Sequence, residues 1–404
     1  TGAMFTTTHG TSITLNASGN NFSSNVNNNT GFSALANGIG STITVASFQN
    51  NVMANNINGN GLRFEALAGG TLNVANFTGN TLTGNGLNGA FLRANGTSSL
   101  IVGGFGVNGQ TVNTFNSNGG FGINFDASAG GSIFGPAGVG NFTVVNNAIG
   151  TTGAGNGMGG INAIADATSP ALSTLNLTIG GTTTGDANTI VANTDAGIAY
   201  SLRNNSTGAL VIRSNTITNT VDNAATTTLL GQGIFIEVAG TSTLNNSVFD
   251  ANTIIGNAAS GIQGLIRESG MVTNLVVGNT DGDNDNGNII TGNAGDGIGF
   301  NMIAGSVFVF GSAGIRPGAG MRRGTIGLFG GEDMPDVLPT FHFAGTDRPV
   351  YLAFAFRRLE EMGFQVPEEC LAAEFDRYCG DFLELGKGEI VVRAVTRGES
   401  AVVA

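Results

Sequence analysis

Three aspartates at alternate positions form the pattern in this sequence that best fits a metal site. Asp281, Asp283 and Asp285 lie in the stretch GNTDGDNDNGN, whose Asn, Gly and Asp residues predict a flexible loop. Carboxylates at this spacing suit a hard cation such as calcium. An EF-hand needs Gly and Glu at its sixth and twelfth loop positions, which are Asn286 and Gly292 here, so that module is excluded. A solvated turn is the alternative interpretation.

The one basic cluster consists of Arg316, Arg322 and Arg323 in IRPGAGMRRGT. Guanidinium groups at this density can bind a phosphate or an acidic partner. The neighbouring glycines do not form a nucleotide loop, because neither a lysine followed by serine nor a long helix comes after them. We expect either a partner-binding patch or solvated arginines at the corners of a repeat.

The remaining charged residues do not form a pattern that is typical of an acid–base catalytic site. A polysaccharide lyase needs clustered carboxylates, a bound calcium ion and an Arg or Lys base. The arginines before residue 305 are Arg63, Arg93, Arg203, Arg213 and Arg267, and no lysine precedes Lys387. Because no acid–base pair is defined, charges scattered on turns are the expected arrangement. No catalytic residue and no cofactor beyond calcium is predicted.

Two cysteines, Cys370 and Cys379, both lie near the end of the chain. The same region contains His342 but no further histidine, so a zinc site is unsupported. We expect the thiols to be small buried hydrophobic groups on or near a helix, rather than a disulfide or a nucleophile.

Charge divides the sequence near residue 305. Residues 1–304 contain 13 acidic residues and 5 arginines, whereas residues 305–404 contain 14 acidic and 10 basic residues. The net charge of −12 argues against nucleic acid or an anionic membrane as the partner. No apolar run reaches the roughly 20 residues of a membrane helix. The start, TGAMFTTTHG, lacks the basic end and apolar core of a signal peptide.

A repeat fills residues 1–303. It consists of Asn, an apolar residue at +2, Asn at +5, Gly at +9 and an apolar residue at +10. Copies are NTLTGNGLNGA from Asn80, NTFNSNGGFGI from Asn113, NTIVANTDAGI from Asn188, NTIIGNAASGI from Asn252 and NIITGNAGDGI from Asn288. Looser copies begin at Asn20, Asn51, Asn147 and Asn215.

Each copy combines short apolar alternations, typical of half-buried strands, with turn residues. Three such strands per unit, with copies beginning 33 residues apart (80 to 113) to 36 residues apart (252 to 288), favour one coil of a right-handed parallel β-helix. Recurrent asparagines at a corner then stack as a ladder between coils. A sandwich or a propeller is the alternative, but the Trp-Asp signatures of propeller blades are absent.

A second period of 19 residues begins at Gly292 and overlaps the last copy. It places Gly292 on Gly311, Gly299 on Gly318 and Met302 on Met321. These matches predict a glycine-rich solenoid of shorter coils over residues 304–330, with one buried methionine per coil. The expected fold class is therefore all-β, one solenoid continued by another, with a small helical cap.

Residues 331–404 form a tail of mixed character. Residues 350–364 place apolar groups on one helical face, and Pro367 followed by two acids predicts the start of a second helix. The late EIVVRAV predicts a strand. We expect the helices to cap the open end of the solenoid, which otherwise exposes unpaired strand edges.

The NTIxxNxxxGI copies resemble the right-handed β-helix repeat proteins of bacterial surfaces, which include pectate-lyase-like and adhesin-like families. The later stretches GSAGIRPGAGMRRGTI, LPTF and GDFLELGKGEIVVR resemble the glycine-rich repeat of the glutamate synthase carboxy-terminal domain, and above all the C subunit of formylmethanofuran dehydrogenase, or of the formyltransferase/hydrolase complex. That family has more such coils and a different amino-terminal part, so the chain reads as a chimera of two solenoids.

Two functions follow from these resemblances. The resemblance of the later stretches implies a structural partner in a complex that transfers formyl groups between a methanofuran-type carrier and tetrahydromethanopterin. It also implies cytoplasmic one-carbon metabolism, with the catalytic metals held by other subunits. The β-helix resemblance implies an extracellular or cell-surface protein for adhesion or carbohydrate binding, and less readily a polysaccharide lyase. The near absence of lysine favours the second.

Overall fold

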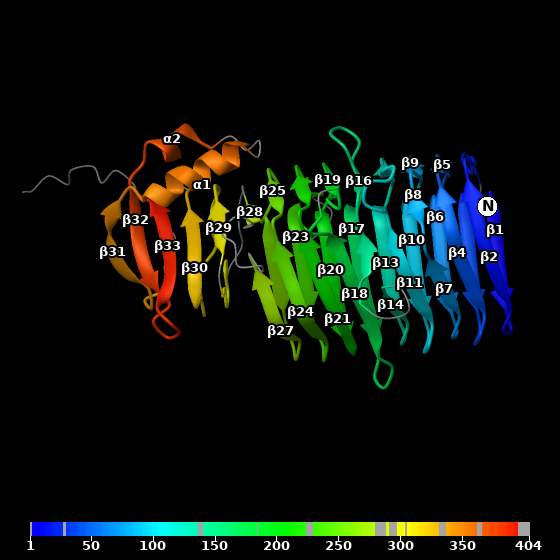
Figure 1. Ribbon diagram of the computed structural model, residues 1–404. Coiled ribbons are helices and arrows are strands. Elements are labelled where there is room, and N and C mark those ends of the chain that lie inside the picture. Colours follow the sequence, from blue (N-terminus) through cyan, green and yellow to red (C-terminus); the bar gives the residue numbers. More distant parts are fainter. Residues whose placement is uncertain are drawn as a thin grey trace, which may run out of the picture. The chain divides into compact units, whose positions relative to one another are not determined.

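The computed structural model describes residues 2–26, 30–135, 140–183, 185–223, 229–278, 288–290, 297–303, 305–330, 337–361 and 366–394. The chain forms two compact units, Thr1–Val276 and Val277–Ala404. Strands make up most of both units (Figure 1). The finer division predicted at residues 303 and 330 stays a prediction.

Three sheets of parallel strands form the first unit, and each coil from β3 to β25 adds at least one strand to every sheet. In Figure 1 these strands follow one another in chain order from blue to green. Sheet A consists of β1 (Ala3–Thr8), β3 (Phe32–Asn37), β6 (Leu62–Leu67), β10 (Ala90–Asn95), β13 (Phe121–Ser128), β17 (Gly159–Ala167), β20 (Ala196–Asn204), β23 (Gln232–Val238) and β26 (Ile262–Ile266).

Sheet B is built in the same way with two short additional strands. Its path is β2 (Ser12–Ser18), β4 (Thr42–Gln49), β7 (Thr71–Val74), β11 (Leu100–Phe105), β14 (Ser132–Phe134), β18 (Ser173–Gly180), β21 (Ser206–Arg213), β24 (Thr243–Asp250) and β27 (Met271–Val277). The additions are β8 (Phe77–Thr78) and β15 (Phe142–Val144). Sheet C of this unit contains β5 (Val52–Ala54), β9 (Thr81–Thr83), β12 (Asn113–Asn116), β16 (Asn147–Ile149), β19 (Thr189–Val191), β22 (Thr216–Thr218) and β25 (Thr253–Ile255).

The three sheets enclose a core of aliphatic and phenylalanine side chains, which confirms the predicted parallel β-helix. Alternate residues of each strand point inward, so equivalent residues of successive coils stack. Phe48, Phe77 and Phe105 form one such stack, with ring centroids 5.4 and 4.2 Å apart. All three are fully buried. Burial of apolar surface along this column drives coil-to-coil association.

Two asparagine ladders run along the strands of sheet C, one at or just before the start of each strand and one after the strands as far as β19. The first contains Asn20, Asn51, Asn80, Asn113, Asn147, Asn188, Asn215 and Asn252, and the second contains Asn25, Asn56, Asn85, Asn118, Asn156 and Asn193. From Asn20 to Asn215 and from Asn25 to Asn156, each side-chain amide donates to the Oδ1 of the asparagine in the next coil. The +5 spacing in the sequence is therefore the distance across one short strand, and the predicted ladder is confirmed.

The glycine at +9 follows from the second ladder. A Cβ on Gly89 would lie 2.6 Å from the carbonyl oxygen of Gly122 and 2.9 Å from Nδ2 of Asn118. Any side chain here would push apart two coils and one ladder amide, so the repeat keeps glycine. The hydrogen bonds of the ladder and the close approach of the backbones therefore occur at the same corner of the coil.

A serine ladder at the corner between sheets A and B has no counterpart in the sequence prediction. Ser41, Ser99 and Ser173 accept hydrogen bonds at Oγ from the backbone N–H groups of Gly10, Gly69 and Gly130 at 3.0–3.2 Å. Ser242 accepts one from Ser206 at 3.3 Å. Because these serines do not recur at a fixed offset in every copy, the sequence pattern does not reveal them.

Val277–Ala404 contains β28 (Asn288–Ile290), β29 (Ser306–Val309), β30 (Arg323–Leu328), β33 (Lys387–Arg393), β32 (Phe375–Gly380) and β31 (His342–Asp347), in that sheet order. Asn288 pairs with Val307, and Val307 pairs with Ile326, so each coil advances by 19 residues. Met302 and Met321 are both buried. The predicted 19-residue period and its methionines are confirmed.

The last strands of this sheet close it differently. β33 continues the parallel order by pairing with β30, whereas β32 and β31 are antiparallel. Helix α1 (Val350–Glu361) confirms the predicted helix as far as residue 361. Its Leu352, Phe356 and Leu359 belong to one buried cluster with Phe375 and Val391 of the sheet, so α1 covers a sheet face (Figure 1).

The predicted start of a second helix after Pro367 is confirmed, but the helix is only one turn long. Helix α2 (Glu368–Leu371) ends before Phe375, where β32 begins. Pairing of β32 between β31 and β33 overrides the local helical propensity, because the strand buries Phe375 and satisfies its backbone groups on both sides. Cys379 consequently lies on a strand.

Candidate functional site

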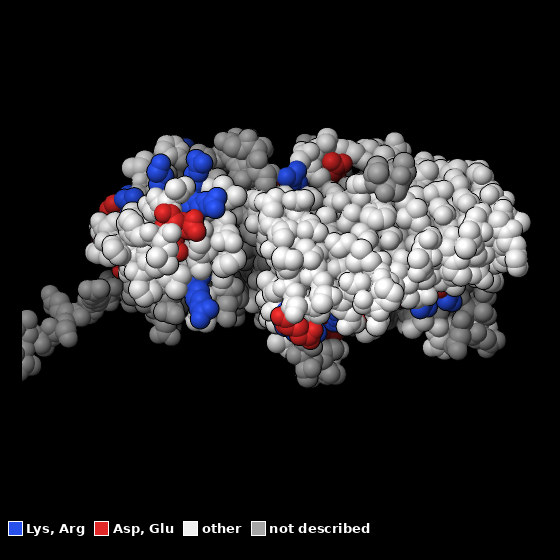
Figure 2. All heavy atoms as spheres, turned by 90° about the horizontal axis from the view of Figure 1, so that it is seen from below, with Lys and Arg blue, Asp and Glu red and all other residues white. Residues whose placement is uncertain are grey.

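Charged side chains of the first unit concentrate on the outer face of sheet A. Arg63, Arg93 and Arg203 lie on β6, β10 and β20, and Arg267 directly follows β26. The carboxylates on the same sheet are Glu65, Asp126, Asp166 and Glu237. Figure 2 shows red and blue spheres confined to small groups on an otherwise white surface. The expectation of charges scattered on turns is therefore wrong for these strand residues, whereas Asp186, Asp195, Asp222 and Glu268 do lie outside the strands.

Parallel register explains this concentration. Arg93 pairs along the ladder with Glu65 of one neighbouring strand and Asp126 of the other. Arg93 Nε lies 3.3 Å from an oxygen of Asp126. Residues about 30 positions apart thus become neighbours on one face, as cross-strand pairs do in any sheet.

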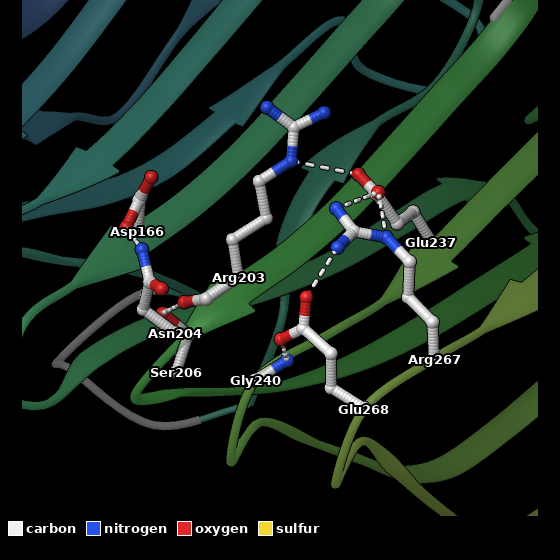
Figure 3. A network of polar contacts seen from close by, with 8 residues as sticks. All are labelled: Asp166, Arg203, Asn204, Ser206, Glu237, Gly240, Arg267 and Glu268. Carbon is white, nitrogen blue, oxygen red and sulfur yellow. Dashed lines mark hydrogen bonds and ion pairs between the residues drawn. The ribbon is translucent and has the colours of Figure 1, made fainter.

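The best-formed group is the network of Arg203, Glu237 and Arg267 (Figure 3). Arg203 Nε donates to one oxygen of Glu237 at 2.7 Å, and Arg267 donates to the other from Nε at 3.0 Å and from Nη2 at 2.7 Å. Arg267 also donates to Glu268 at 2.6 Å. Only 3% of the Glu237 side chain is exposed, so this carboxylate is a nearly buried acceptor between two half-exposed guanidinium groups.

These arginines determine the ionisation of Glu237. Burial alone would raise the pKa of Glu237, but the hydrogen bonds from Arg267 and Arg203 outweigh it and hold the pKa below its usual value. The carboxylate is therefore charged at neutral pH. The network joins side chains from three successive coils. Because it has no proton to exchange near pH 7, its role is structural, and we call it a clamp because it holds these coils together.

Glu237→Gln is expected to lower the free energy of unfolding at pH 7 by about 2 kcal/mol, because both arginines lose their anionic partner but remain partly hydrated. A depressed native pKa stabilises the protein above the unfolded-state pKa and stops doing so as the pH falls through the native value. The wild-type advantage should therefore shrink below pH 4.5, the ordinary value. Denaturant unfolding at pH 7 and at pH 3 measures this difference.

Glu268→Gln provides the matched control, because 57% of that side chain is exposed. It should change stability by less than about 0.5 kcal/mol at either pH, as exposed ion pairs do. Equal losses for the two variants, or a Glu237→Gln loss that persists unchanged at pH 3, would contradict the clamp.

Asp126 differs from Glu237 in that burial raises its pKa despite the hydrogen bond to Ser128 and the nearby Arg93. Asp166, on the same sheet, accepts a hydrogen bond from Asn204 at 2.6 Å. Each carboxylate described on this face thus has a partner of its own. The neighbouring carboxylates Asp166 and Glu65 also contribute to the raised pKa of Asp126.

The predicted calcium ligands, Asp281, Asp283 and Asp285, lie outside the described residues. Within the described ranges, no three His, Cys, Asp or Glu side chains come together as a metal site. The calcium site therefore stays a prediction.

The basic cluster lies on the 19-residue coils. Arg316, Arg322 and Arg323 are all exposed. Arg322 Nε lies 3.4 Å from Glu384, and Arg323 begins β30. Binding of a partner by these three arginines stays a prediction.

Both cysteines are reduced in this structure. Cys370 is buried in the cluster under α1, where burial raises the pKa of its thiol to about 11. It is thus the small buried hydrophobic group that the sequence predicts, whereas Cys379 is only half-buried. Among the described helices, none is long and apolar enough to cross a membrane.

Comparison with known proteins adds one distant likeness. No protein-family model and no curated protein is similar enough to this chain to count as a match. The chain is similar to one chain in the X-ray crystal structure of the formyltransferase/hydrolase complex from Methylorubrum extorquens in complex with methylofuran, with 18% identity and a TM-score of 0.21. The match covers 82% of this chain and 78% of that chain. A likeness at this level carries no argument about function.

Proposed function

We propose that this protein is a non-catalytic β-solenoid scaffold, and that Val277–Ala404 serves as a structural subunit in a complex transferring formyl groups between a methanofuran-type carrier and tetrahydromethanopterin. The 19-residue register of β28, β29 and β30 carries this proposal. The stretch with that register is the one that resembles the C subunit of such complexes. The fully partnered carboxylates on sheet A also favour a structural role over catalysis.

A docking surface for such a complex is available in Val277–Ala404. Phe382, Leu383 and Leu385 lie between β32 and β33 and are 54%, 80% and 59% exposed. Three large apolar side chains on one short segment are costly to leave in water. The segment belongs to the stretch GDFLELGKGEIVVR that carries the resemblance, so another subunit of the complex is the proposed occupant.

Leu383→Asp is expected to weaken subunit binding at least tenfold, because a charge then has to be buried in an apolar contact. The experiment co-expresses the tagged full chain with the other subunits of a formyltransferase/hydrolase complex and measures their co-elution. Leu87→Asp is the control, since Leu87 is 48% exposed but lies in the first unit. Elution of the wild-type chain alone, while the other subunits assemble with one another, would refute the proposal.

A surface or secreted protein for adhesion or carbohydrate binding is the second candidate. It is favoured by the low density of charge on the β-helix coils, where several of the described charges form ion pairs with one another (Figure 2). Retention of the full chain on immobilised glycans, without retention of formyltransferase/hydrolase subunits, distinguishes this role from the first.

A further inference from the structure

A hollow of about 560 Å³ lies on the outer face of sheet B in the first unit. Its floor contains Thr143, Thr178 and Val211, which pair directly in register on β15, β18 and β21. Asn108 and Asp186 contribute to its walls. This hollow is separate from the charged network on sheet A.

Two insertions in the repeat build the walls. In the regular coils only two residues separate β21 from β22 and β24 from β25. By contrast, residues 106–112 separate β11 from β12, and the chain from 181 to 188 separates β18 from β19. Both insertions leave the same corner, and the coil containing β15 lies between them. Insertions of this kind mark the binding face of a solenoid.

The walls are held in place by hydrogen bonds and close contacts. Asn146 Nδ2, on the intervening coil, donates to the carbonyl oxygens of Val107 at 3.1 Å and Gln110 at 2.8 Å. Gly185 approaches Asn108 so closely that a Cβ there would lie 2.7 Å from Asn108 Oδ1. The two insertions therefore meet across the intervening coil, and the hollow exists before any ligand arrives.

The lining combines opposite charges, hydroxyl groups and small apolar patches. One oxygen of Asp186 accepts the backbone N–H of Thr183 at 3.2 Å, which orients the carboxylate. Arg213, also in the lining, lies 3.8 Å from Asp250. Thr178 Oγ1 accepts a hydrogen bond from Asn141 Nδ2 at 3.0 Å. Val145 and Val211 supply apolar surface between these polar groups.

We propose that this hollow binds a neutral polyhydroxylated ligand of the size of one or two pyranose rings. Vicinal hydroxyl groups both donate and accept, so they match a carboxylate, a guanidinium and two threonine hydroxyls at once. The valines suit the C–H face of a sugar ring. The lining contains one cation, Arg213, and one anion, Asp186, and the carboxylate of Asp250 lies beside Arg213. Because these charges offset one another, the hollow disfavours a charged ligand. The site is independent of the scaffold role and gives the second candidate function a location.

Titration of the full chain with cellobiose, methyl α-D-glucopyranoside and sodium D-glucuronate, followed by saturation-transfer NMR and calorimetry, tests the proposal. Saturable binding of at least one neutral sugar is expected, with glucuronate at least threefold weaker. Thr178→Trp fills the floor and should reduce affinity at least tenfold, and Val211→Trp should do the same.

Thr174→Trp is the matched control. Thr174 lies on the same strand and the same outer face as Thr178, four residues away and outside the hollow. The affinity of the Thr174→Trp variant for the neutral sugars should therefore stay within twofold of wild type. Absence of saturable binding for both neutral sugars overturns the proposal, as does unchanged affinity in correctly folded Thr178→Trp and Val211→Trp. Tighter binding of glucuronate than of either neutral sugar refutes the assignment to a neutral ligand. Binding of formyltransferase/hydrolase subunits is unaffected in every case, so the two proposals fail separately.

Discussion

Replacing Asn118 with leucine should lower the free energy of unfolding of the first unit by about 4 kcal/mol, because several buried groups lose hydrogen bonds worth about 1–3 kcal/mol each. Asn118 Nδ2 donates to the carbonyl oxygen of Leu82 at 3.0 Å and to Asn156 at 2.8 Å. Its Oδ1 accepts from both N and Nδ2 of Asn85. Leucine has nearly the same size but can replace none of these bonds.

Denaturant unfolding of the full chain, followed by far-UV circular dichroism, measures this loss. Asn20→Leu is the control, since Asn20 is an exposed first rung that bonds to only one neighbouring asparagine. It should cost less than about 1 kcal/mol, the usual net worth of one exposed hydrogen bond. A similar loss for both variants would mean that the ladder adds nothing beyond ordinary surface polarity.

Gly208→Ala is expected to destabilise the first unit by about 3 kcal/mol, which combines overpacking with the loss of a buried hydrogen bond. A Cβ at this position would lie 1.9 Å from the hydroxyl oxygen of Tyr200 and 2.6 Å from the carbonyl oxygen of Leu175. Tyr200 is fully buried and donates to that same carbonyl at 2.6 Å. Burial raises the pKa of Tyr200, so the phenol remains a donor at neutral pH.

A double-mutant cycle with Tyr200→Phe isolates this collision. Removal of the hydroxyl leaves room for the new methyl group, so Gly208→Ala should cost about 1–2 kcal/mol less in the Tyr200→Phe background, a typical coupling energy for residues in contact. The carbonyl of Leu175 still crowds the site, so rescue is partial. Equal costs in both backgrounds would exclude Tyr200 as the cause. Thermal unfolding of the four proteins provides the comparison.

Both predictions concern contacts between successive coils, and these contacts also hold the proposed ligand hollow. Thr143, Thr178 and Val211 come from three neighbouring coils, so their spacing depends on coil registry. A variant that loosens the ladder near Asn147 or Asn188 should therefore weaken a bound sugar without touching it. Such a variant loses sugar affinity and also has a lower free energy of unfolding. This second effect distinguishes it from a substitution at the floor of the hollow, which weakens sugar binding directly.

Local repetition was enough for the sequence to predict most of the architecture. In a solenoid each coil meets mainly its neighbours, so a contact that stabilises one pair of coils recurs in the next and leaves a period in the sequence. The asparagines five residues apart and the glycine at +9 are such traces. The 19-residue spacing from Asn288 to Val307 and on to Ile326 is another. These features needed no knowledge of distant contacts.

Features outside the repeating positions were decided by tertiary structure. Arg203, Glu237 and Arg267 belong to no recurring motif, and a shift of one residue in strand register would send each to the opposite face. Residues 375–380 became a strand because β31 and β33 supplied partners on both sides. The hollow on sheet B needed two insertions in nonadjacent coils to meet. Sequence periodicity reports what each coil shares with the next, whereas a site arises from what a few coils do differently, and only their stacking brings those differences together.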